Sequence, residues 1–263
     1  MLSQWAINHF KTLREISMHK SVLALSAVAA LAAAGLATAA EPSPVAGNMS
    51  LVSEYRFRGI DQTFGKPALQ GGFDYAHSSG AYLGNWNSNV NPGAGFAGAN
   101  LEMDFYGGWK KSFGDFGADL GVIYYAYPGS TPKVDNTEIY LGGNWKTLSV
   151  KYYHAIDDYF SVPDSKNSNY LDFGFTHDFG GGFGLVAHYG IFKFKNVADG
   201  DYNDWKLGVT YDLTGWVLGA AYVDTDAKGD CGVPELYCFP NGNGTKFRDA
   251  GKATVVFSVM KTF

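Results

Sequence analysis

The sequence predicts an all-β fold: a transmembrane, antiparallel, up-and-down β-barrel of about 12 strands, preceded by a cleaved signal peptide. Three observations lead to this prediction. The N-terminus has the features of an export signal, segments of about ten residues then alternate apolar with polar side chains, and the connections between them alternate short with long. Together these features are typical of barrels that cross a bacterial outer membrane.

The N-terminal region is predicted to be removed during export. Lys20 precedes a run rich in Ala and Leu, residues 21–40, and the run contains the small-residue triplet Ala37-Thr38-Ala39. A positive charge, an apolar stretch and an A-x-A site are the three parts of a secretory signal peptide, and an uncleaved anchor fits this ending less well. We therefore divide the chain into an N-terminal extension and signal peptide, 1–39, and a barrel, 40–263.

Composition limits the classes of function. The 263 residues include 34 Gly, 19 Phe, 17 Tyr and 6 Trp, and only 17% are charged. The net charge of −5 argues against nucleic acid as a partner. After residue 40 no run of 18 apolar residues occurs, so a membrane span would have to be made of strands. No phosphate-binding glycine loop is found, and we expect no cofactor.

The first barrel strand is predicted at residues 48–59. Side chains of a strand alternate between its two faces, so Tyr55 and Phe57 are expected to face lipid with Leu51. Glu54, Arg56 and Arg58 share the other face, which is expected to line a wet lumen. In a soluble sandwich the same apolar face would be the core, and one strand cannot separate these interpretations.

The later strands repeat the alternation. Segment 100–110 is the clearest case, with Phe105 on one face and Glu102 and Asp104 on the other. In segment 81–90, Asn85 and Asn87 are expected to face the lumen, because an amide costs less against water than against lipid. The predicted strands after the first are 67–76, 81–90, 100–110, 116–127, 136–145, 148–155, 170–178, 183–193, 204–212, 216–225 and 252–263.

The connections supply the strongest signal for a membrane barrel. Tight turns are predicted at 77–80, 112–115, 146–147, 179–182 and 213–215, and longer loops at 61–66, 91–99, 128–135, 156–169, 196–203 and 226–251. Short periplasmic turns and long external loops are the expected asymmetry of an outer-membrane barrel, whereas a soluble sandwich predicts no such alternation. The terminal aromatic residue, Phe263, is predicted to be part of the signal read by the barrel assembly machinery.

Three stretches carry a resemblance to a known family. They are SEYRFRGIDQT at 53–63, PALQGGFDYAHSSGAYLGNWNSNV at 67–90 and LEMDFYGGW at 101–109. These stretches resemble the TorF-type porin family of bacterial outer-membrane proteins, most specifically in the first third of the barrel. The resemblance implies an outer-membrane barrel that acts as a channel. It brings no defined substrate and no catalytic residues.

The predicted lumen face carries charges of both signs. The side chains predicted to line it are Glu54, Arg56, Arg58, Asp74, Asn85, Asn87, Glu102, Asp104, Lys110, Asp119, Glu138, Lys151, Asp172 and Lys206. Opposed rows of acids and bases would give a hydrated channel with a selective constriction, which passes small hydrophilic solutes or ions by passive diffusion. The alternative is that the charges pair and fill the lumen, which leaves a non-conducting barrel with a structural or surface-binding role.

Other groups of residues give weaker indications of a catalytic or metal site. His154 with Asp157 and Asp158 could activate water as a hydrolase at the rim, but no nucleophile motif accompanies it, so we do not expect an enzyme. The acidic stretch 199–204 could hold calcium, yet it lacks a complete binding loop, and no metal site is expected.

In an exported chain, the closely spaced Cys231 and Cys238 are expected to form a disulfide. The expected partners are therefore outer-membrane lipid, the assembly machinery and small polar solutes or ions.

Overall fold

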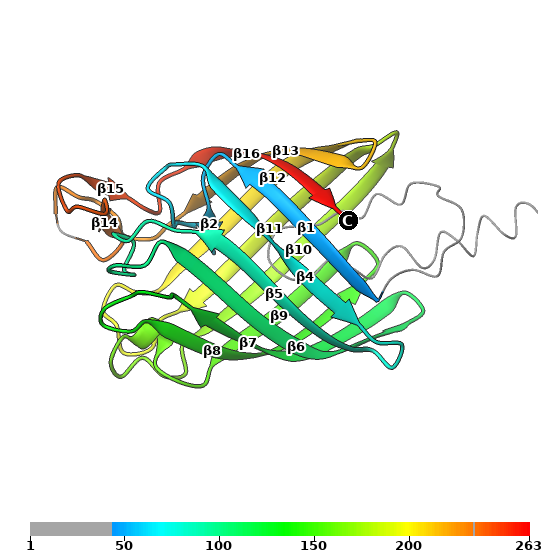
Figure 1. The fold of residues 1–263 in the computed structure, drawn as a ribbon, viewed down its shortest axis with the longest axis horizontal. Coiled ribbons are helices and arrows are strands. Elements are labelled where there is room, and N and C mark those ends of the chain that lie inside the picture. Colours follow the sequence, from blue (N-terminus) through cyan, green and yellow to red (C-terminus); the bar gives the residue numbers. More distant parts are fainter. Residues whose placement is uncertain (1–43, 234) are drawn as a thin grey trace, which may run out of the picture.

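A computed structural model describes residues 44–233 and 235–263, so the predicted signal peptide lies outside the described residues. Twelve antiparallel strands form one closed barrel in the order β1-β16-β13-β12-β11-β10-β9-β8-β7-β6-β5-β4 (Figure 1). Most neighbours in the ring are consecutive strands of the sequence. The pairs β1–β4 and β13–β16 have short strands between them in the sequence, and the pair β1–β16 closes the barrel. The predicted up-and-down barrel of about 12 strands is confirmed.

The barrel strands and the smaller elements have the following bounds. The wall consists of β1 (Val45–Val52), β4 (Ala68–Ala76), β5 (Ala81–Asn89), β6 (Leu101–Phe113), β7 (Phe116–Ala126), β8 (Asp135–Trp145), β9 (Leu148–Ala155), β10 (Asn169–Gly180), β11 (Phe183–Lys193), β12 (Tyr202–Leu213), β13 (Trp216–Thr225) and β16 (Thr254–Thr262). The connections contain two two-stranded sheets and a 3-10 turn: β2 (Arg56–Phe57) with β3 (Ile60–Asp61), β14 (Cys238–Pro240) with β15 (Phe247–Asp249), and η1 (Tyr159–Ser161).

The two faces of the wall differ in chemistry, because side chains alternate along each strand. Large apolar side chains such as Phe73, Leu83 and Leu141 are exposed on the outside. Charged side chains such as Glu138 and Lys151 are buried on the inside. An apolar exterior with a polar interior is the pattern of a barrel surrounded by lipid.

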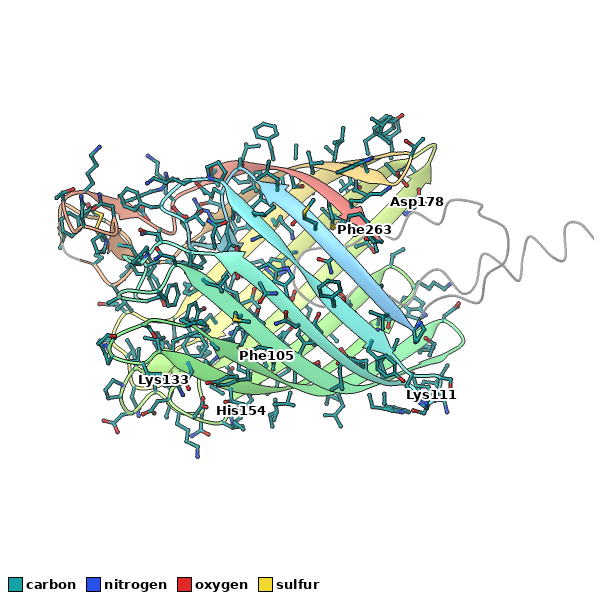
Figure 2. The ribbon with its side chains drawn as sticks, in the orientation of Figure 1. Phe105, Lys111, Lys133, His154, Asp178 and Phe263 are labelled. Carbon is teal, nitrogen blue, oxygen red and sulfur yellow. A yellow bond between two sulfur atoms is a disulfide. The ribbon has the colours of Figure 1, made fainter. Side chains whose placement is uncertain are left out.

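The two ends of the barrel differ in the length of their connections. The turns between β4 and β5, β6 and β7, β8 and β9, β10 and β11, and β12 and β13 are short, and we refer to this end as the short-turn end. Lys111, Asp178 and Phe263 lie at this end, whereas Lys133 lies toward the long-loop end (Figure 2). The predicted alternation of short turns and long loops is therefore observed.

The first strand is shorter than predicted. It ends at Val52, and residues 53–67, which we name the inner loop, leave the wall and fold into the barrel. The hairpin β2–β3 reverses at Arg58 and Gly59, whose φ angles of 48° and 80° suit a two-residue type I′ turn. The prediction of one strand over 48–59 is wrong because the hairpin continues the same alternation of apolar and charged residues.

The side chains of the inner loop also point differently from the prediction. Tyr55 and Phe57, expected to face lipid, lie inside, where Tyr55 contacts Trp86 and Phe57 contacts Tyr125 edge to face. Glu54 and Arg58 are buried, as charges directed into the lumen should be, but they come from the inner loop and not from the wall. The inner loop thus supplies both apolar and charged groups to the interior.

Asn85 and Asn87 face outward, so the prediction that they line the lumen is wrong. Asn85 is the cross-strand neighbour of Phe73 and Phe105, both of which are exposed on the outer surface. The amides bond to each other and to the wall: Asn87 Nδ2 donates to Asn85 Oδ1 at 2.6 Å and Asn85 Nδ2 to the Asp104 carbonyl at 2.9 Å. These internal bonds lower the cost of the outward position.

The longest connection, between β13 and β16, contains the sheet β14–β15 at the long-loop end (Figure 1). Cys231 and Cys238 are joined there by a disulfide. Backbone bonds fix this connection to the inner loop, since Asp61 N donates to the Ala250 carbonyl at 2.9 Å. The position of the longest connection and that of the inner loop are therefore linked.

Candidate functional site: a hairpin across the lumen

The inner loop reaches from one wall of the barrel to the opposite wall. At one side the Tyr55 hydroxyl donates to Glu102 Oε1 on β6 at 2.9 Å. At the other side Gly59 lies against β12, where a Cβ added to it would be 2.7 Å from Asp204 Cβ. Since β6 and β12 are six places apart in the ring of twelve, the hairpin crosses the full width of the lumen.

Arg58, at the tip of the hairpin, is held by a carboxylate of the wall. Its Nη1 and Nη2 donate to Glu138 Oε1 and Oε2 at 3.0 and 2.7 Å, and Nη1 also donates to the Tyr159 hydroxyl at 3.1 Å. The guanidinium lies 4.4 Å from the ring centroid of Tyr170 and 5.0 Å from that of Tyr153. The side chains of Arg58 and Glu138 are 5% and 0% exposed, so neither charge has water as an alternative partner.

A second group of ion pairs fixes the base of the hairpin. Glu54 lies between Arg56 and Arg248, and its distance to Arg248 Nη2 is 2.8 Å. Arg248 Nε is also 3.1 Å from Asp61 Oδ2, and Arg56 Nη1 donates to the Ala250 carbonyl at 2.8 Å. Because Arg248 and Ala250 belong to the β13–β16 connection, this connection helps to hold the inner loop inside.

Apolar clusters fill the space on both sides of the hairpin. One contains Tyr55, Trp86 and Tyr125 with side chains of the loops, including Phe96, which stacks on Tyr127 at 3.9 Å between ring centroids. The other surrounds Ile60 and consists of Ala155, Tyr159, Tyr170, Phe192, Tyr202, Tyr237 and Ala250. Ring and aliphatic side chains are therefore packed against the hairpin from both sides of the interior.

Between the hairpin and the short-turn end, the inner wall is polar. Asp119 accepts hydrogen bonds from the Tyr82 hydroxyl at 2.6 Å and from Lys151 Nζ at 2.9 Å. Asp74 accepts from the Tyr106 hydroxyl at 2.6 Å. This part of the interior presents hydroxyls and charges of both signs, which suits water and hydrophilic solutes.

His188 forms a cluster that the sequence did not reveal. Its Nδ1 lies 2.7 Å from Asp172 Oδ1 and its Nε2 lies 2.7 Å from Asp204 Oδ1, while the Tyr170 hydroxyl donates to Asp204 Oδ2 at 2.8 Å. With both aspartates ionised, both histidine contacts are hydrogen bonds only when both ring nitrogens carry protons. The alternation along each strand places Asp172 and Asp204 on the inner face. Only the register of β10, β11 and β12 shows that His188 lies between them.

The predicted lumen residues fall into three groups. Those directed inward from the wall are Asp74, Glu102, Asp104, Lys110, Asp119, Glu138, Lys151, Asp172 and Lys206. Those inside the barrel but on the inner loop are Glu54, Arg56 and Arg58. Asn85 and Asn87 lie outside, as described above. Whether any of the inward residues lines a conducting path stays a prediction.

The residues of the possible hydrolase site at the rim have other bonding partners. His154 shares a 3.3 Å contact with the Tyr152 hydroxyl, while Asp157 and Asp158 accept backbone N–H groups from Thr137 and Lys166. These carboxylates therefore bond to the backbone and do not orient the histidine as a general base would require.

In the acidic stretch, the carboxylates pair with lysines. Asp199 pairs with Lys228 and Asp201 with Lys193. The hydrogen bond to Asp199 raises the pKa of Lys228. Within the described residues, no group of three or more His, Cys, Asp or Glu side chains is placed to hold a metal ion. No helix in the described part of the chain is long and apolar enough to span a membrane.

The sequence matches one family model over residues 36–263, which is most of the chain. The chain belongs to the Gcw_chp family. The description of this family is "bacterial protein of unknown function", and the TorF-type family named above remains a resemblance. A search of curated proteins gives no match.

Two solved structures that share the fold are porins. The KdgM porin, in complex with disordered oligogalacturonate, aligns with a TM-score of 0.50 at 9% identity and covers 83% of this chain and 97% of its own. The NanC porin aligns with a TM-score of 0.50 at 10% identity, covering 83% of this chain and 98% of its own. At this identity the likeness concerns the fold, and the Gcw_chp barrel is a porin-like barrel.

Proposed function

We propose that this Gcw_chp protein is a bacterial outer-membrane channel for passive diffusion of small hydrophilic solutes or ions, and that the inner loop forms its constriction. The observation that carries the proposal is the hairpin itself, which crosses from β6 to β12. The polar wall between this hairpin and the short-turn end supports a hydrated path. The apolar exterior supports a position in lipid.

The conformation described here corresponds to a closed or narrowed state of such a channel. The inner loop is held by side-chain ion pairs, ring contacts and a backbone bond from Asp61 to Ala250. The barrel wall is complete without this loop, since β1 pairs directly with β4 and β16. Displacement of the loop would therefore open the lumen without breaking the wall. Conduction through a displaced or rearranged loop is the mechanism we propose.

Conductance in planar lipid bilayers tests this function. The protein is compared with a variant in which residues 54–63 are replaced by a Gly-Ser linker of equal length. We expect small or infrequent openings for the unmodified protein and a steady, several-fold larger conductance for the variant. The matched control replaces the exposed residues 242–246 in the same way and should behave as the unmodified protein does.

The main alternative is a non-conducting barrel with a structural or surface-binding role. It is favoured by the two apolar clusters, which fill the interior around the hairpin. If neither the unmodified protein nor the loop variant conducts, this alternative holds and the channel proposal fails. Equal, large conductance in both would instead mean that the inner loop is not the constriction.

Two further measurements test the proposed location in the outer membrane. The mature chain should begin at Ala40, which N-terminal sequencing of membrane-derived protein determines. In detergent, unheated protein should migrate differently on a gel from boiled protein, because a closed barrel resists unfolding until it is heated. Identical migration, combined with solubility without detergent, would contradict an outer-membrane barrel.

The oligogalacturonate is bound to the KdgM porin, and at 9% identity we propose no specific solute for this protein from that complex.

A further inference from the structure

Most charges at the level of the hairpin have a partner of opposite sign. Glu54 and Asp61 contact Arg248, and Glu138 contacts Arg58. Glu102 and Asp104, on the inner face of β6, are different, because among the described residues no lysine, arginine or histidine lies within ion-pair distance of either carboxylate. Two acidic side chains next to the hairpin thus lack a cation.

These two side chains are also deeply buried. Glu102 is 1% and Asp104 is 3% exposed, and they are two residues apart on one face, so their Cα atoms are roughly 7 Å apart. The Tyr55 hydroxyl donates to Glu102 Oε1, but Glu102 Oε2 and Asp104 Oδ1 are buried without a hydrogen-bond partner in the described structure. Buried carboxylates of this kind are unfavourable unless a positive charge or a proton accompanies them.

Asn136 provides a second, independent observation beside this pair. It is 0% exposed, and neither its Oδ1 nor its Nδ2 has a partner within the described residues. The register places it in the same row of inward side chains as Asp104, with Tyr125 of β7 between them. The amide of Asn136 on β8 and one oxygen of each carboxylate on β6 therefore lack partners on the same inner wall, with β7 between the two strands.

The atoms that need a partner are mainly oxygens, and oxygen ligands bind alkali and alkaline-earth cations in preference to softer metals. With only two carboxylates and one amide, the site is suited to a cation that keeps part of its water, and not to a fully chelated metal. Glu138 does not compete for this cation, because Arg58 occupies both of its oxygens.

We propose that Glu102, Asp104 and Asn136 form a cation-binding position on the inner wall beside the hairpin, which takes a partly hydrated alkali or alkaline-earth cation. In a conducting state, the same carboxylates would make the constriction selective for cations. This selectivity rests on the channel function proposed above, whereas cation binding itself does not.

Thermal unfolding tests cation binding without any need for conduction. The gel mobility shift on heating is followed in potassium or calcium chloride and in choline chloride at equal ionic strength, because choline is too large for a buried oxygen site. The unmodified protein should unfold several degrees higher in the inorganic salts. The isosteric variant Glu102→Gln/Asp104→Asn should lose this difference, and Asp115→Asn, at an exposed turn, should keep it. Equal midpoints for the unmodified protein in all salts would mean that protons neutralise the pair, and would overturn the proposal.

The zero-current potential under a potassium chloride gradient tests selectivity. We expect cation selectivity in the unmodified protein, a permeability ratio reduced several-fold in Glu102→Gln/Asp104→Asn, and no change in Asp115→Asn. An unchanged ratio in the double variant overturns the selectivity assignment. Absence of conductance in every variant, including the loop replacement, refutes the channel function, and the thermal measurement then still decides whether the cation site exists.

Discussion

Arg58 and Glu138 are 80 positions apart in the sequence, yet they form a two-bond ion pair inside the barrel. This contact joins the tip of the inner hairpin to β8. The charges are shielded from water, so the pair acts as an attachment point and not as a solvated part of a channel wall. Its strength decides how readily the inner loop can leave its position.

Replacement of Arg58 by Ala should release the hairpin. The variant leaves the Glu138 carboxylate buried and unpaired, which costs about 3 to 5 kcal/mol if the loop stays in place. We expect a lower unfolding midpoint in urea and more frequent channel openings. The double variant Arg58→Ala/Glu138→Ala should lose less stability than the sum of the losses of the two single variants, because it leaves no buried charge without a partner. Additive losses would show that the pair does not hold the loop.

Gly59 should not tolerate a side chain. Its φ of 80° disfavours other residues, and a Cβ there would also press against Thr225 and Asp204. Gly59→Ala should therefore destabilise the barrel by more than the roughly 1 to 2 kcal/mol of a left-handed backbone alone. Gly114→Ala is the matched control, because Gly114 has a φ of 66° and open space around it. Urea unfolding compares the two; equal losses would mean that the tip of the hairpin is not in contact with β12 and β13.

The outward position of Asn85 and Asn87 predicts that they do not influence ion flow. In the variant Asn85→Leu/Asn87→Leu, insertion, conductance and zero-current potential should remain those of the unmodified protein. The measurement is the same bilayer recording, with Glu102→Gln/Asp104→Asn as the contrasting variant from the adjacent strand. A change in potential for the leucine variant would place the amides inside and reverse the register of β5.

The disulfide is expected to order only the outer connection. Closing the short ring between Cys231 and Cys238 restricts the unfolded chain by up to about 2 to 3 kcal/mol in the chain-entropy model. Cys231→Ser/Cys238→Ser should increase protease cleavage within 226–253 while the heat-induced gel shift of the barrel stays unchanged. Loss of the gel shift would mean that the bond supports the wall as well.

The strand pattern could be predicted because lipid and water impose opposite demands on the two faces of a wall. Phe105, Glu102 and Asp104 on β6 satisfy these demands without ambiguity, and the short turns follow from Gly and polar residues. The hairpin at 56–61 could not be separated from the first strand, since it has the same period. Only Arg58-Gly59 marks the reversal, and Asn-Gly or Asp-Gly is the more usual turn signal.

The faces of β5 were misassigned for a related reason. Asn85 and Asn87 were expected inside with the other polar residues, which would place Trp86, on the opposite face of the strand, outside. The inner loop reverses this preference, because Tyr55 offers Trp86 an apolar neighbour within the barrel. The partners of His188 depend on the register of three strands, which composition and period do not determine.

The bond between Glu54 and Arg248 joins positions 194 residues apart, near the beginning and near the end of the barrel. Contacts of such long range form late, since the intervening chain must be ordered first. We therefore expect residues 53–67 to gain protection from hydrogen exchange only after β1 has paired with β16, and earlier protection of this segment would contradict that order. An assembling barrel would then keep a vacant interior until its seam is sealed, and the hairpin would enter as the final step.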